Sequence, residues 1–176
     1  PFLRNILIVA FLFATVLPIY DLCFIVPSYQ DLLIQETERD AARFVRFMTV
    51  TNSLNEIELR ADSIPRALIK HIGKLKEEET LNKLRIFSPL GKIVFSTDSQ
   101  EIGTINKKDY FRNIVAKGKF YSKMVHKESV TAEGTVTDID LVETYVPVMV
   151  DGQFHGAMEV YYDITDGQES LNSLSK

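Results

Sequence analysis

The chain has 176 residues, 20 lysines and arginines against 24 aspartates and glutamates, 45% hydrophobic residues and a single cysteine. This length suits one domain of about 100–150 residues with attached segments, and the average composition excludes disordered and fibrous classes. One cysteine excludes an internal disulfide framework and a thiolate zinc site. The net charge of −4 gives no electrostatic reason to expect a nucleic-acid partner.

The first 29 residues differ from the rest because their only charges are Arg4 and Asp21. The apolar run 6–26 spans roughly 31 Å at about 1.5 Å per residue, which is close to the hydrocarbon thickness of a bilayer. No small-residue cleavage pattern follows this run, so a signal peptide is disfavoured; a buried core helix is usually shorter or one-sided. We expect residues 1–29 to form a membrane anchor, with Arg4 on the cytoplasmic side.

A long helix is predicted over residues 28–62, because no proline or glycine follows Pro27 within it. Small and apolar residues recur there at steps of three and four and form one face: Ala41, Phe44 and Met48. Charges of both signs cover the opposite face, as in a solvated helix. Around Pro65 the sequence predicts a second helix over residues 64–72 that ends at Gly73.

After residue 82 the hydrophobic period changes from helical to alternating, which predicts β-strands. The five expected strands cover residues 84–87, 92–96, 119–126, 136–150 and 153–164. A short helix over residues 107–116 is expected between the second and third strands, and the tail 165–176 has the composition of a polar helix. Helices followed by strands indicate an α+β fold, with the long N-terminal membrane-to-ectodomain helix packed on a five-stranded antiparallel meander.

Four short strings then occur in a suggestive order. They are Leu-Arg-Ile-Phe-Ser-Pro-Leu-Gly-Lys-Ile-Val-Phe-Ser-Thr-Asp at 84–98, Glu-Ile-Gly at 101–103, Asp-Tyr-Phe-Arg at 109–112 and Gly-Ala-Met-Glu-Val-Tyr-Tyr-Asp-Ile-Thr at 156–165. With the order of elements, they make residues 30–165 resemble the Cache (PAS-like, PDC) sensor domains. These domains are the extracytoplasmic input of bacterial histidine kinases, including those of two-component systems, and of diguanylate cyclases and chemoreceptors.

The resemblance implies a PAS-like sheet and a position on the inner membrane, with residues 30–176 in the periplasm. It also implies that residues 166–176 are a linker towards a second membrane helix and a cytoplasmic output domain. The chain begins with proline rather than methionine, so we expect it to be a fragment of a longer protein.

No catalytic or metal site is predicted. The three histidines, at 71, 126 and 155, are far apart and show no zinc-binding spacing. No nucleophile elbow, P-loop or dinucleotide fingerprint occurs. Asp138 and Asp140 would share a strand face suited to a hard cation, although solvated carboxylates are the simpler interpretation. We therefore expect neither an enzyme nor a bound cofactor in this chain.

In the resembled family a small molecule binds between the sheet and the insert that follows the second strand. The positions here that fit such a site are the candidate ligand-binding residues Lys108, Tyr110, Arg112, Tyr121, Lys123, Tyr145 and Asp163. Cations beside tyrosines make charge-assisted hydrogen bonds to a carboxylate, which predicts a small organic anion. Amino-acid-binding members carry an aspartate where this chain has Lys123, and a lysine would repel an ammonium group.

Three interpretations remain open. The first is a small-molecule sensor that signals through its long helix in a homodimer, with the face 41–48 either at the dimer interface or packed on the sheet. The second is a protein-interaction or structural ectodomain, favoured if tight packing fills the space between insert and sheet. The third is a divalent-cation sensor that uses Asp138, Asp140 and Glu143.

Overall fold

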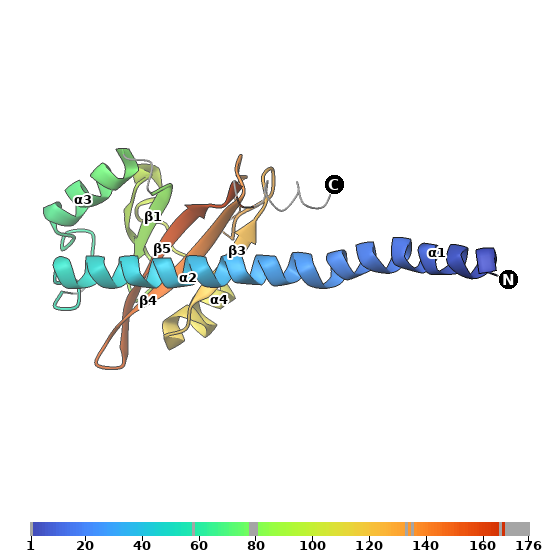
Figure 1. The fold of residues 1–176 in the computed structure, drawn as a ribbon. Coiled ribbons are helices and arrows are strands. Elements are labelled where there is room, and N and C mark those ends of the chain that lie inside the picture. The colour runs from blue at the N-terminus through green and yellow to red at the C-terminus, as the bar shows by residue number, and fades with distance from the viewer. Residues whose placement is uncertain are drawn as a thin grey trace.

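The computed structural model describes residues 2–57, 59–77, 81–132, 134, 136–165 and 167. A long N-terminal helix runs along one face of a five-stranded sheet and projects far beyond it (Figure 1). The predicted linker and tail helix over 165–176 lie outside the described residues, apart from 165 and 167.

The long helix is continuous from Phe2 to Thr51. It comprises α1 (Phe2–Tyr20), a π-helical turn η1 (Asp21–Ile25) and α2 (Val26–Thr51). The π turn directly precedes Pro27, which has no N–H to donate and whose ring crowds the carbonyl four residues back. No residue of α1 is buried. Within the described part of the chain, the continuous helix Phe2–Thr51 is the one helix long and apolar enough to cross a membrane.

The long helix ends earlier than the predicted boundary at residue 62. The side chain of Asn52 donates to the carbonyl of Met48 over 2.9 Å, and Ser53 adopts a left-handed φ of 51°. An asparagine that bonds the preceding turn competes with the helical ladder, so turns follow Thr51. The second helix, α3 (Arg66–Glu77), runs through Gly73 instead of ending there, because its apolar side packs on the core through Leu68 and Ile72.

The sheet contains five antiparallel strands in the order β2-β1-β5-β4-β3. The strands are β1 (Lys83–Phe87), β2 (Ile93–Ser96), β3 (Tyr121–Val125), β4 (Leu141–Val150) and β5 (Gln153–Asp163). The prediction of a simple meander was wrong. The last strand, β5, lies in the centre of the sheet, where it pairs with β1 on one side and with β4 on the other. The prediction that the fourth strand begins at residue 136 was also wrong, because Thr137 and Asp140 bond neighbouring loop backbone there.

The two faces of the sheet differ in chemistry. The face towards α2 and α3 is apolar, and its core includes Leu84, Ile86, Val146, Met158 and Val160. Ala41 is 0% and Met48 1% exposed in this core, so the face 41–48 of α2 packs into its own domain. The sequence left open whether this face lies at a dimer interface or packs on the sheet, and in the structure it packs on the sheet.

The opposite face is covered by the insert between β2 and β3. The insert contains the 3₁₀ turn η2 (Ser99–Glu101), the helix α4 (Asp109–Asn113) and the 3₁₀ turn η3 (Val115–Lys117). The helix predicted over 107–116 is therefore two shorter pieces. Phe111 and Val115 anchor the insert against Phe87 and Tyr145 of the sheet.

Candidate functional site

Charged and tyrosine side chains form two rows across the face of the sheet that the insert covers. Strand pairing and period-two alternation place them side by side on this face. The first row crosses all five strands and consists of Tyr121, Tyr145, Glu159, Arg85 and Ser96. The second row crosses four strands and consists of Lys123, Glu143, Tyr161 and Lys83. The other face carries the apolar core described above.

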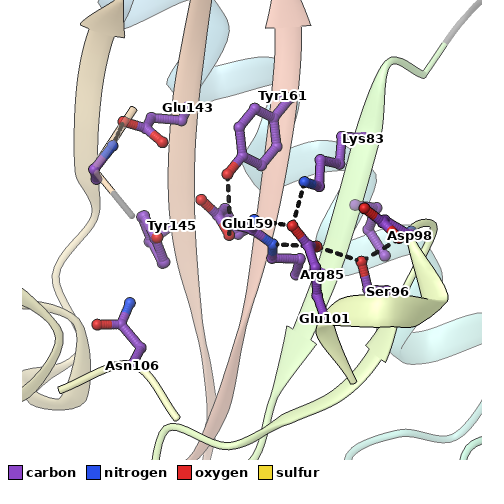
Figure 2. A network of polar contacts seen from close by, with 12 residues as sticks. Lys83, Arg85, Ser96, Asp98, Glu101, Asn106, Glu143, Tyr145, Glu159 and Tyr161 are labelled. Atoms are coloured by element: carbon purple, nitrogen blue, oxygen red, sulfur yellow. Dashed lines mark hydrogen bonds and ion pairs between the residues drawn. The ribbon is translucent and has the colours of Figure 1, made fainter. Parts of the chain in front are cut away.

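Arg85 is the centre of an ion network and is 3% exposed. Its Nη1 donates to Glu159 Oε2 over 3.0 Å and to the Tyr161 hydroxyl over 2.6 Å. Its Nε donates to Glu101 Oε2 over 2.8 Å, and its Nη2 donates to Glu101 Oε1 over 2.5 Å (Figure 2). The guanidinium therefore joins the central strand β5 to the first turn of the insert.

The carboxylate of Glu101 has further donors besides Arg85. Lys83 Nζ lies 2.5 Å from its Oε1, and Ser96 Oγ lies 2.8 Å from its Oε2. Burial alone would raise the pKa of Glu101, but the hydrogen bonds from Arg85, Lys83 and Ser96 and the charge of Arg85 lower this pKa to about 2. Burial likewise opposes the charge of Arg85, yet its acidic partners and Tyr161 raise the pKa of the guanidinium above its usual value. The Arg85 guanidinium and the Glu101 carboxylate are thus both charged at neutral pH.

A tyrosine cluster occupies the other half of the first row. The rings of Tyr110 and Tyr121 stack with centroids 4.1 Å apart and planes 5° apart. The hydroxyl of Tyr110 lies 3.0 Å from that of Tyr145 and accepts a hydrogen bond of 3.0 Å from Asn106 Nδ2. Phe111 packs edge-on against Tyr145 at 6.4 Å between centroids. Aromatic rings therefore fill the space between the insert and this part of the sheet.

The structure brings only part of the predicted ligand-binding set together. Tyr110, Tyr121 and Tyr145 form the cluster just described. Lys123 is half-buried in the second row, where its Nζ donates to the carbonyl of Val130 over 2.8 Å. These four residues lie on or against the polar face of the sheet.

The remaining three predicted residues lie outside the cluster. Lys108 and Arg112 are exposed, because α4 turns Phe111 towards the sheet and the neighbouring side chain outward. Asp163 is exposed at the end of β5, where its Oδ1 accepts hydrogen bonds from the backbone N and the hydroxyl of Thr165. Asp163 thus has the contacts of a cap at the end of a strand.

Arg85, Glu159 and Glu101 were missed by the sequence reasoning. A usable signal existed for the first two, since each stands between apolar residues on a strand that reads as buried. Arg85 lies between Leu84 and Ile86, and Glu159 follows the same pattern. Glu101 stands in a polar loop, and nothing in the local sequence marks its carboxylate as a partner of Arg85.

The acidic residues suggested for a cation do not form a metal site. No group of three or more histidine, cysteine, aspartate or glutamate side chains is placed to hold a metal ion in the described part of the chain. Asp140 accepts a hydrogen bond from the backbone N of Lys127, and Glu143 accepts one from the backbone N of Ala132. Both carboxylates therefore order the loop that follows β3.

This architecture matches the fold of known PAS-like sensor domains. The chain is similar to the sensor domain of DcuS from E. coli, with a TM-score of 0.54 and 11% identity over 82% of this chain and 98% of that one. Further similar structures are the sensor domain of the histidine kinase DctB from V. cholerae (TM-score 0.44, 13% identity, 86% and 60% covered) and the periplasmic domain of RsbU from Chlamydia trachomatis (0.46, 14%, 83% and 58%). No protein-family model matches the sequence, and no curated protein does.

We predict that Arg85→Met lowers the free energy of unfolding by about 3–5 kcal/mol, because it leaves buried Glu159 without its cation. Urea unfolding of the full chain in detergent micelles, followed by circular dichroism, measures the change. Arg112→Met is the matched control: the same substitution at an exposed position of the insert should stay within about 0.5 kcal/mol of the wild type. Equal effects of the two substitutions would contradict the network.

We predict that Glu101→Gln lowers the free energy of unfolding at neutral pH by about 2 kcal/mol, the value of a hydrogen bond to a charged group. The folded-state pKa of about 2 lies below the ordinary 4.5. The stabilisation is therefore complete above pH 4.5 and is lost as the pH falls towards 2. Unfolding curves of wild type and variant should converge over this range. A gap that stays constant with pH, or an equal one for exposed Asp109→Asn, contradicts the assignment.

Proposed function

We propose that this chain is the extracytoplasmic sensing part of a membrane-anchored receptor and binds a small organic anion on the polar face of its sheet. Residues 1–29 are the anchor in the inner membrane, residues 30–165 are the periplasmic sensor domain, and residues 166–176 lead to a second membrane helix. The output domain, a kinase, cyclase or chemoreceptor module, belongs to the remainder of the receptor. The sensor itself has no catalytic role.

The observation that carries this proposal is the pair of buried polar rows under the insert. A sheet face that serves only packing is expected to be apolar, as the face under α2 is. Burying charged groups costs free energy unless they are paired, and clusters of such groups gather at functional sites. The fold shared with the DcuS sensor domain supports a sensor role.

Cations and hydroxyl donors on this face support an anionic ligand. Lys83, Arg85 and Lys123 lie in the two rows, interleaved with tyrosine hydroxyls. Such groups bind a carboxylate with charge assistance and with direction. Glu143 and Glu159 lie in the same rows and limit the net positive charge of this face. The proposed ligand is therefore a single small anion.

Signal transfer in this proposal uses the continuity of α1, η1 and α2. The helix that packs on β4 and β5 continues without a break into the proposed membrane anchor (Figure 1). A ligand shifts the equilibrium towards the arrangement of sheet and helix that it binds better. In the proposed homodimer, α2 would contact its copy through apolar side chains that its own domain leaves exposed: Leu32, Phe47 and Val50.

A second candidate function is a protein-interaction or structural ectodomain without a small ligand. The stacked rings of Tyr110 and Tyr121 and the packing of Phe111 favour it, because they fill the space that a ligand would use. The two candidates differ in whether small molecules stabilise the fold.

We predict that organic acids raise the thermal unfolding temperature of the full chain in detergent micelles, since a ligand that binds only the folded state stabilises it. The screen should include acetate, succinate and citrate, amino acids, Mg²⁺ and Ca²⁺. Lys83→Ala should weaken the binding of an active acid by roughly tenfold, the equivalent of one charge-assisted hydrogen bond. Exposed Lys127→Ala should leave the affinity unchanged.

The other outcomes of this screen are informative. Stabilisation by amino acids alone would refute the anion assignment, and stabilisation by divalent ions alone would favour a cation sensor. A flat response to the whole screen would favour the ectodomain without a small ligand.

We predict that the domain faces the periplasm of a Gram-negative host. In a Cys23→Ala background, an impermeant maleimide added to spheroplasts should label Leu90→Cys, whose native side chain is 88% exposed. Phe2→Cys, on the cytoplasmic side of the proposed anchor, should be labelled only after lysis. The opposite labelling pattern, or recovery of the full chain in the soluble fraction, would rule out this topology.

A further inference from the structure

The carboxylate of Glu101 is bound as a ligand carboxylate would be bound. Both of its oxygens accept hydrogen bonds from the planar guanidinium of Arg85, and Lys83 and Ser96 add one donor on each oxygen (Figure 2). A bidentate guanidinium contact completed by an ammonium and a hydroxyl group is a specific receptor for a carboxylate. The donors belong to two adjacent strands, whereas the acceptor belongs to a loop.

The donors stay in place without Glu101. Arg85 and Ser96 are buried, and the guanidinium is held from its other side by Glu159 and Tyr161. Side chains fixed by contacts behind the site form a preorganised binding group. The carboxylate-binding group therefore consists of side chains on the sheet, and the carboxylate bound to it is that of Glu101.

The loop that carries Glu101 has few attachments of its own. No residue of η2 is buried. The loop is tied to the sheet at its two ends: Thr97 N donates to the carbonyl of Leu84 over 3.0 Å, and Gly103 N donates to the carbonyl of Ile93 over 2.8 Å. Within the loop, Asp98 N donates to Ser96 Oγ over 3.0 Å, and this bond breaks when the segment moves. Segments with little buried surface open locally at small cost. Residues 98–102 can leave the site while both ties and the strand pairing persist.

Solvent reaches the site from the side on which Glu101 and Lys83 lie. The side chains of Glu101 and Lys83 are 19% and 21% exposed, against 3% for Arg85 and 0% for Glu159. An incoming molecule thus meets the Glu101 carboxylate and the Lys83 ammonium first. Deeper groups of the network contact it only after Glu101 has moved.

Charge balance defines the class of molecule that can take the place of Glu101. Ion pairs join two basic side chains, Lys83 and Arg85, to two acidic ones, Glu101 and Glu159. Departure of Glu101 alone leaves one uncompensated cation in a mostly buried site, which is costly. Another carboxylate restores the balance, whereas a neutral or cationic molecule does not.

We propose that Lys83, Arg85 and Ser96 form the carboxylate-binding site of this domain, that Glu101 of the same chain occupies it in the absence of ligand, and that a ligand carboxylate displaces Glu101 and releases residues 98–102. This proposal rests on the proposed function, because it names the groups that receive the organic anion. It assigns recognition to the β1–β2 edge rather than to α4.

Succinate binding to the full chain in detergent micelles, measured by calorimetry, tests the displacement. Glu101→Gln removes the competing charge and should bind succinate roughly tenfold more tightly than the wild type. Arg85→Lys keeps the charge but loses the bidentate contact and should weaken binding at least tenfold. Asp109→Asn makes the same charge change at an exposed position of the insert and should match the wild type.

Hydrogen exchange gives an independent measure that does not depend on the stability of a variant. Succinate should accelerate the exchange of the backbone amides of Gln100, Glu101 and Ile102 in the wild type. In Glu101→Gln those amides should already exchange faster and should respond little to succinate. Binding seen only in Glu101→Gln would also support the assignment, with the internal carboxylate outcompeting the probe.

Two results overturn this inference in different ways. If succinate binds the wild type and Glu101→Gln equally and leaves exchange of residues 98–102 unchanged, the anion binds elsewhere, and only this inference fails. If succinate binds none of the variants, both this inference and the proposed anion sensing fail.

Discussion

The ion pairs of the buried Arg85 guanidinium determine how the insert fits against the sheet. Arg85 contacts Glu159 on the central strand and Glu101 in the insert. In a site of low polarity a charged group needs all of its partners at once, because an unpaired charge costs several kcal/mol, of order 3–5. The position of the first turn of the insert is therefore set by the charge of a residue on the sheet.

Because side chains alternate along each strand, the two faces of the sheet have different compositions and different roles. Leu84 and Ile86 lie in the apolar core under α2, while Arg85 between them lies in the polar network. The apolar side supplies burial and stability, and the polar side supplies selective partners. Because both sides belong to the same backbone, β5 carries Glu159 of the network on one face and contacts α2 with the other, and α2 continues into the apolar helix α1.

Much of this fold follows from the sequence. The apolar N-terminal helix, the α+β order and the five strands come from hydrophobic periodicity, and the structure pairs Tyr121 and Tyr145, both predicted for the site, across β3 and β4. The end of α2 did not follow, since it depends on one side chain, that of Asn52, bonding the preceding turn. Strand order also did not follow, because period-two patterns define faces and not partners.

The sequence marks Arg85 and Glu159 as charges between apolar residues but does not decide whether they are buried. A charge that alternates with apolar residues is solvated if its face is open and buried if another element covers it. The insert covers this face, so Arg85 and Glu159 are buried, while Lys108 and Arg112, on the insert itself, remain exposed. Pairing between Arg85 and Glu101 depends on how a loop folds back, which local patterns do not encode.

The two halves of the first row differ in how readily a ligand can enter. Opening the tyrosine cluster separates stacked and edge-on aromatic pairs, each worth about 0.5–1.5 kcal/mol beyond its buried area, and exposes the ring of Phe111 to water. Exchange at Arg85 replaces one carboxylate by another with the same donors and the same net charge. For the displacement proposed above, the cost of access is therefore lower at the β1–β2 edge than at the tyrosine cluster.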